Sequence, residues 1–213
     1  MNAAEGVGRR SRSLDKLNSS LSLTLRHLNT VDSALRSART KDNMAIMNHA
    51  ITRNCASAIQ SLYPQLNDYP KSVLSEMFLR RPLQIVDKAE DTLQFQEIVR
   101  LGSYAAICSA MVDRVFRKLT NNSRSTQALI EKILANTGTI IDKKVMDESM
   151  LYIEMRHLIV HNSGLMDARF TATYAHKFKH MGEGAMLPIS KGAAKDGVGA
   201  VRKLCQEVDY ALQ

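Results

Sequence analysis

Residues 143–164 read KKVMDESMLYIEMRHLIVHNSG, and the rest of the chain is best interpreted outward from this stretch. The run from Val145 to Val160 has the composition of a helix, and Gly164 closes it. Glycine suits the left-handed backbone position just past a helix end. The stretch therefore predicts a helix over about 143–161, with His161 in its last turn.

The remaining sequence indicates further helices and little else. Apolar residues recur every three or four positions from Leu14 to Leu35, which is the period of one buried helix face. Tyr63-Pro64 predicts a helix stop followed by a loop over 64–70, and Gly102 inside a long apolar pattern favours close packing between helices. The predicted helices cover about 14–38, 42–62, 71–79, 87–119, 125–135, 143–161 and 193–212. We therefore expect an all-α fold, an up-and-down helical bundle.

The two ends of this bundle and one internal segment differ from it in composition. Residues 1–12 are rich in glycine and arginine and predict a disordered basic leader before a single helical domain over 13–213. The segment of about 165–190 mixes β-branched and aromatic residues with glycines, so we expect either an irregular arm or a small β-hairpin there. Its Lys177 and Lys179, flanked by His176 and His180, are candidates for contact with an RNA backbone, or form a solvated basic loop.

Composition narrows the class of protein. The 213 residues include 29 Lys and Arg against 21 Asp and Glu, and a formal net charge of +8 attracts polyanions such as nucleic acid. Cys55, Cys108 and Cys205 are too far apart in sequence for a CxxC site and are expected to be buried in a reducing compartment. The sequence contains no 18-residue apolar run and no signal-peptide core, so we expect a cytoplasmic protein with no membrane partner.

The end of the predicted helix carries residues suited to acid–base chemistry on a phosphodiester. His157 and His161 are four residues apart and share one helix face, whereas Arg156 lies about 140° around the helix from His161. Arg156 must therefore reach across with its long side chain, or the helix must loosen, which Asn162-Ser163-Gly164 favours. Histidine can move a proton near neutral pH, and arginine can hold a phosphate. RNA supplies its own 2′-hydroxyl nucleophile, so such a site requires no metal and no cofactor.

Arg156-His157-Leu158-Ile159-Val160-His161 resembles the signature of the HEPN-domain ribonucleases, in which an arginine and a polar residue precede a histidine by five and four positions. Asn162, Gly164 and the segment 164–170 are similar to the residues after that signature in several of these proteins. The resemblance implies an all-α bundle that dimerises with two motifs facing each other, and metal-independent RNA cleavage, often in toxin–antitoxin or antiphage systems with a partner protein. It assigns Arg156 and His161 as the catalytic pair. His157 takes the supporting position, and Asn162 and Ser163 join it as candidates for contact with phosphate or RNA.

Other interpretations of the same residues remain open. Arg156 could form a helix salt bridge with Asp147 or Glu148 while His161 only caps the helix. Glu154 and His157 form a Glu-x-x-His, as in di-iron bundles, but the sequence offers no second copy. His157 and His161 could also chelate a single ion, although Arg156 between them is an unfavourable neighbour for a cation. Two further alternatives are a HEPN-like protein that binds nucleic acid or a partner without cutting, and a purely structural helical protein.

Overall fold

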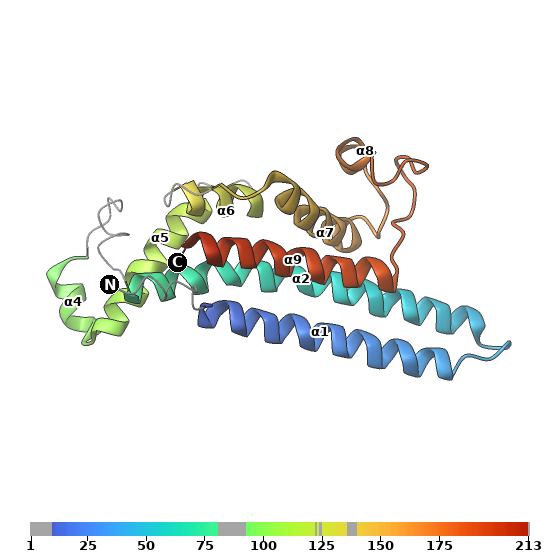
Figure 1. Ribbon diagram of the computed structural model, residues 1–213, viewed down its shortest axis with the longest axis horizontal. Coiled ribbons are helices and arrows are strands. Elements are labelled where there is room, and N and C mark those ends of the chain that lie inside the picture. Colours follow the sequence, from blue (N-terminus) through green and yellow to red (C-terminus); the bar gives the residue numbers. More distant parts are fainter. Residues whose placement is uncertain (1–9, 81–92, 122, 124, 136–139, 213) are drawn as a thin grey trace, which may run out of the picture. The chain divides into compact units, whose positions relative to one another are not determined.

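The computed structural model describes residues 10–80, 93–121, 123, 125–135 and 140–212 (Figure 1). Within these residues every regular element is a helix, so the predicted all-α class is confirmed. The helices are α1 (Arg12–Ser37), α2 (Met44–Arg80), α4 (Phe95–Leu101), α5 (Tyr104–Asn121), α6 (Thr126–Ala135), α7 (Lys143–His161), α8 (Ala168–Tyr174) and α9 (Lys191–Leu212).

The chain divides into two compact units. Unit 1 contains residues 1–17, 67–141 and 205–213, and unit 2 contains residues 18–66 and 142–204. Because α1, α2 and α9 each contribute residues to both units, the single helical domain expected over 13–213 stays a prediction.

Unit 2 is a bundle whose helix directions follow from its contacts. The contacting pairs are Thr24 with Gln65 and Leu28 with Asn54 between α1 and α2, Ser22 with Arg202 and Asp32 with Lys191 between α1 and α9, and Ser149 with Ala200 and Tyr152 with Gly197 between α7 and α9. In each of these three pairs of helices, the residue numbers rise along one helix as they fall along the other. The helices α1, α2, α7 and α9 therefore alternate in direction along the chain, which is the predicted up-and-down order.

One buried cluster in unit 2 supports the end of α7. Leu151, Met155 and Leu158 on α7 pack with Ile59 of α2 and with Phe170 of α8. Each of these side chains is at least nine-tenths buried, and burying one such side chain contributes roughly 1.5–3 kcal/mol. The apolar face of α7 is therefore buried in the core, and His157 and His161 on another face of the helix are exposed.

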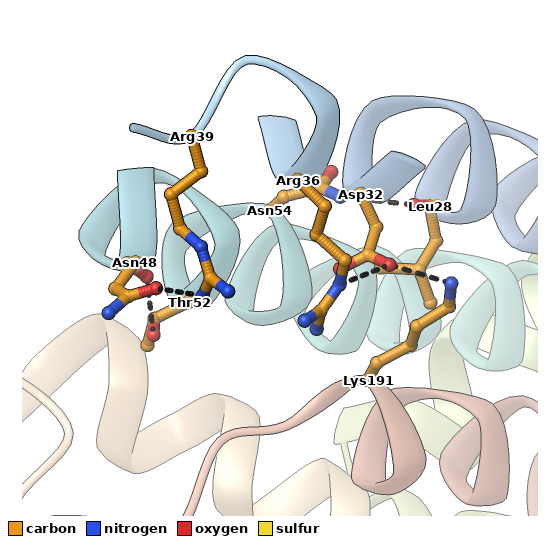
Figure 2. Close-up of polar contacts among 8 residues, drawn as sticks. All are labelled: Leu28, Asp32, Arg36, Arg39, Asn48, Thr52, Asn54 and Lys191. Carbon is orange, nitrogen blue, oxygen red and sulfur yellow. Dashed lines mark hydrogen bonds and ion pairs between the residues drawn. The ribbon is translucent and has the colours of Figure 1, made fainter. Parts of the chain in front are cut away.

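A buried carboxylate joins the start of α9 to α1 (Figure 2). The side chain of Asp32 is only 3% exposed and accepts two bonds of 3.0 Å from Arg36 Nε and one of 2.7 Å from Lys191 Nζ. Figure 2 also shows Asn54 of α2 donating to the Leu28 carbonyl oxygen of α1, at 3.2 Å. These polar contacts tie three helices together at one end of the bundle.

Unit 1 contains buried apolar side chains, such as Val112 of α5 and Ile130 of α6, and a buried polar contact. Asp209 of α9 accepts hydrogen bonds from the backbone N–H and hydroxyl of Ser11 and from the Tyr69 hydroxyl. Burial raises the pKa of the Tyr69 phenol, so it acts here as a hydrogen-bond donor. Glu76 accepts from the backbone N–H groups of Arg12 and Ser13, where a carboxylate stabilises the positive end of the α1 dipole.

The predicted helix break at Pro64 is wrong. Helix α2 continues through Pro64 and Pro70 to Arg80. A proline inside a helix costs about 3 kcal/mol because it removes a backbone hydrogen bond. Four side chains on this stretch are almost fully buried at helical spacing, namely Leu62, Leu66, Tyr69 and Val73. Their combined burial outweighs the cost of the two prolines.

The single long helix predicted over about 87–119 is also wrong in its described part. Helix α4 ends at Leu101, and Gly102 follows with φ of 66° in the left-handed region. A side chain at Gly102 would contact nothing within 4 Å, so close helix packing does not explain this glycine. Gly102 instead ends α4 and permits α5 to begin at Tyr104. Residues 87–92 lie outside the described residues.

The ends and the arm are partly as expected. Residues 1–9 of the predicted disordered leader lie outside the described residues, but Ser11 is 3% exposed and its hydroxyl caps α1 by accepting from Leu14 N–H. The segment 165–190 is the irregular arm rather than the hairpin. It contains the short helix α8, which the sequence did not predict, and a single antiparallel bridge between Leu165 and Met186 closes its base.

Two further expectations concern cysteines and membranes. Cys55, Cys108 and Cys205 are free and buried, as predicted. None of the helices that the structure describes combines the length and the apolar character needed to cross a bilayer.

Candidate active site

The motif helix has the predicted bounds. The Asp142 side chain caps its first turn by accepting from Lys144 N–H at 2.9 Å, and the helix ends at His161. Both Asn162 N–H and Gly164 N–H donate to the Leu158 carbonyl at 2.9 Å. Gly164 has φ of 78°, which confirms the left-handed position expected there, and Ser163 shares that region with φ of 53°. Two left-handed residues in succession turn the chain sharply away from the last carbonyls of α7.

The helix does not loosen before His161, contrary to what Asn162-Ser163-Gly164 suggested. His157 and His161 therefore keep ideal helical spacing, and their ring centroids lie 4.8 Å apart with the planes at 46°. Both side chains are exposed. Neither imidazole bonds to another residue within the described parts of the chain. The two rings form a solvent-facing pair in the last turn of α7, where the helix dipole favours a cationic group.

Arg156 points towards α2 and lies on a different side of α7 from the histidines. Its guanidinium carbon lies 4.6 Å from the centroid of the Tyr63 ring, in a cation–π contact. The salt bridge considered with Asp147 or Glu148 is not present, and among the described residues Arg156 forms no ion pair. Arg156 thus keeps an uncompensated positive charge while Tyr63 restricts its direction.

The arm packs onto α7 through α8. Arg169 bonds Glu154 at 3.1 Å, and Phe170 lies 4.9 Å from Tyr174 and 5.5 Å from Phe178, ring centroid to ring centroid. Burial is the main cause that raises the pKa of Tyr174 to about 12, with a smaller contribution from Glu154. Tyr174 belongs to the buried core, and the partly buried Phe178 packs against it. Glu154 of the Glu-x-x-His is already engaged by Arg169.

The supporting residues predicted from the sequence have different environments. Asn162 donates from Nδ2 to the Leu165 carbonyl at 2.8 Å, so its amide holds the turn after α7. Ser163 is exposed on that turn, beside His161 in sequence. Lys177 and Lys179 are exposed on the arm, and no contact joins either of them to the histidine pair. Within the described residues no group of three or more His, Cys, Asp or Glu side chains is placed to hold a metal ion.

Two residues that shape this part of the molecule are not evident from the sequence. Tyr63 was interpreted as a helix stop, although the apolar spacing from Leu62 to Leu66 and Tyr69 could have placed it inside α2. The sequence around Asp32 does not indicate that its carboxylate is buried, because a lone aspartate on an amphipathic helix is usually solvated.

Comparison with known proteins adds no family to this geometry. No protein-family model, no curated protein and no solved structure matches the chain.

Proposed function

We propose that this chain is a metal-independent endoribonuclease that cleaves RNA by attack of the 2′-hydroxyl, with the site at the end of α7. The observation that carries the proposal is the exposed His157–His161 pair, 4.8 Å apart in the last turn of a well-packed helix. General acid–base catalysis needs a proton-carrying side chain that the substrate can reach; histidine is the side chain most often used, and both histidines are exposed. The resemblance of residues 156–161 to the HEPN signature supports the same chemistry.

In the proposed reaction, the 2′-oxygen forms a bond to the adjacent phosphorus and the bond from phosphorus to the 5′-oxygen breaks. One imidazole takes the proton of the 2′-hydroxyl, and a protonated imidazole gives a proton to the departing 5′-oxygen. The products are a 2′,3′-cyclic phosphate and a 5′-hydroxyl. Arg156 binds the phosphate and offsets the charge that develops on its oxygens.

The direction of Arg156 supports a site shared by two chains. Within one chain, Arg156 lies over Tyr63 while His157 and His161 face solvent elsewhere around α7. We propose an isologous homodimer in which a two-fold axis near the end of α7 brings both copies of the motif around one phosphate. Val160, Leu165 and Met186 are exposed apolar residues beside the motif, and such an interface would bury them.

The biological setting that we propose rests on the HEPN resemblance alone. It is a cytoplasmic toxin–antitoxin or antiphage system, in which an antitoxin or another defence protein would be the partner. A protein encoded by the adjacent gene that suppresses cleavage when added to the purified chain would support this setting.

Cleavage of a fluorescent RNA in excess EDTA tests the chemistry. We expect cleavage to continue, to leave 2′,3′-cyclic phosphate ends and to spare DNA of the same sequence, because DNA lacks the 2′-hydroxyl. Arg156→Ala and His161→Ala should each lower the rate by about 10²- to 10⁴-fold, and His157→Ala should have a smaller effect. Loss of cleavage in EDTA that a divalent ion restores would contradict the mechanism.

Arg169→Ala and His176→Ala are matched controls, because Arg169 and His176 are an arginine and a histidine that follow one another along the arm, outside the motif. Both variants should cleave normally. If every variant binds RNA and the wild-type chain cleaves none, the alternative of a non-cleaving RNA-binding module of the same fold replaces this proposal.

A further inference from the structure

The separation of the His157 and His161 rings matches that of two imidazoles that chelate one transition-metal ion. Two histidines at positions i and i+4 of a helix lie on one face, and such pairs bind zinc in metalloproteases. In a zinc chelate each ring nitrogen is about 2.0–2.1 Å from the metal, and ligand angles of ~90–109° then place the ring centroids about 4.6–5.3 Å apart. The observed separation is 4.8 Å. We propose that this pair binds a divalent ion of the class that prefers imidazole, namely Zn²⁺, Cu²⁺ or Ni²⁺.

The main electrostatic objection to such a site comes from Arg156, which lies next to His157 in sequence. Within one chain the structure weakens this objection, because the Arg156 guanidinium lies on the Tyr63 ring of α2, 4.6 Å from its centroid. A cation bound by His157 and His161 would therefore not share its face of the helix with the Arg156 of the same chain.

The pair is also preorganised. Leu158 and Met155 hold this turn of α7 in the core of unit 2, and Asn162 N–H continues the hydrogen-bonding pattern past His161. Neither imidazole is engaged by another described residue, so binding breaks no protein contact. Among the described residues no third protein ligand stands beside the pair, since Glu154 is bonded to Arg169. Water would fill the remaining coordination positions, which predicts a reversible site rather than a permanently occupied one.

Occupation of this site has a consequence that rests on the proposed function. A metal ion uses the same nitrogen lone pairs that a general base needs, so metal binding and proton transfer exclude each other. Zn²⁺ should therefore inhibit RNA cleavage, and EDTA should restore it.

Calorimetric titration of the full chain without an affinity tag, using Zn²⁺ at neutral pH, tests the binding. We expect one ion per chain. His157→Ala and His161→Ala should each weaken binding at least about tenfold, because loss of even an outer partner of a ligand costs 10- to 100-fold. Both residues are exposed, so circular dichroism should show unchanged helix content.

The chain supplies a matched control in His176 and His180, which have the same spacing on a non-helical turn of the arm. The double variant His176→Ala/His180→Ala should bind Zn²⁺ like the wild type. Binding that survives in His157→Ala/His161→Ala, or that disappears in the arm variant, would overturn the inference. A chain that binds Zn²⁺ through the motif but cleaves no RNA would contradict only the proposed function, and a chain that cleaves RNA but does not bind Zn²⁺ would contradict only this inference.

Discussion

Tyr63 and Arg156 form the most informative residue pair in the chain. The tyrosine belongs to α2 and the arginine to α7, and their contact decides which side of α7 carries the guanidinium. If Arg156 binds the scissile phosphate as proposed, Tyr63 is a positioning residue, because its ring restricts the orientation of the Arg156 side chain.

Tyr63→Phe and Tyr63→Leu separate this role from a merely structural one. Phenylalanine keeps an aromatic face, so cleavage should stay within about twofold of wild type, whereas leucine loses a cation–π contact worth about 1–2 kcal/mol and should lower kcat/KM about 5- to 30-fold. In an Arg156→Ala background Tyr63→Leu should have no further effect on kcat/KM, which a double-mutant cycle measures. An equal loss in both backgrounds would show that Tyr63 only supports the fold.

Asp32 provides a prediction about stability and pH. The hydrogen bond from Arg36 and then that from Lys191 hold the pKa of Asp32 below its usual value. A carboxylate with a lowered pKa in the folded state stabilises the protein above the unfolded-state pKa, and this contribution disappears as pH falls through the folded-state pKa. Asp32→Asn should therefore lower the free energy of unfolding by roughly 1–3 kcal/mol at neutral pH.

The difference between Asp32→Asn and wild type should shrink in acid, below pH ~4, where the wild-type carboxylate also becomes protonated. Urea unfolding at several pH values measures it. Asp42→Asn, at an exposed position before α2, is the control and should change the free energy of unfolding by less than about 0.5 kcal/mol. A difference that stays constant from neutral pH into acid would show that the ion pairs contribute nothing to stability.

At the scale of elements, α9 approaches α2 and α7 through a glycine. A β-carbon added at Gly197 would lie 2.8 Å from Tyr152 Cδ1 and 2.9 Å from Leu62 Cδ1, which is too close. Gly199, two residues further along the same helix, has open space around it.

These two glycines should respond to alanine in opposite ways. Gly199→Ala should raise the melting temperature, because alanine favours the helix by about 1 kcal/mol over glycine. Gly197→Ala should lower it, because Tyr152 and Leu62 must move, and overpacking costs typically about 1–3 kcal/mol. Thermal unfolding followed by circular dichroism compares them. If both variants were stabilised alike, the close approach of the three helices would be contradicted.

At the scale of the whole molecule, the proposed site requires two chains, and the apolar surface beside the motif supplies the test. Met186 and Leu23 are both 59% exposed, Met186 next to the motif and Leu23 on α1. Met186→Glu would place two like charges in the proposed interface, so it should give a monomer by light scattering and abolish cleavage. Leu23→Glu should remain a dimer with normal activity. A wild-type chain that is monomeric at micromolar concentration would exclude a shared site.

Mixing inactive variants tests the same site from the side of catalysis. An Arg156→Ala chain keeps its histidines, and a His161→Ala chain keeps its arginine. If one phosphate is served from both chains, mixed dimers should recover part of the wild-type rate. Recovery should depend on subunit exchange, and Met186→Glu in either variant should prevent it. No recovery from exchanged dimers would place Arg156 and His161 of one chain in one site.

The sequence alone determined the features that depend on neighbours along the chain. Helical periodicity and composition predicted α1, α6, α7 and α9 to within about two residues, and Gly164 predicted the left-handed turn, because these signals act within one or two helix turns. The spacing of His157 and His161 likewise placed both rings on one face, because residues four apart are neighbours on the surface of any α-helix.

Tertiary structure decided everything that depends on distant partners. Pro64 lies inside a helix because Leu62, Leu66, Tyr69 and Val73 find buried environments, whereas local rules see only the lost hydrogen bond. Arg156 turns away from the histidines because its guanidinium contacts the Tyr63 ring. Tyr63 lies nearly a hundred positions earlier in the sequence, so nothing near Arg156 in the sequence indicates this contact. Asp32 is buried because Lys191, 159 residues away, reaches it. Packing and charge pairing act through space, so periodicity along the chain marks a buried helix face but does not identify the distant residues that cover it.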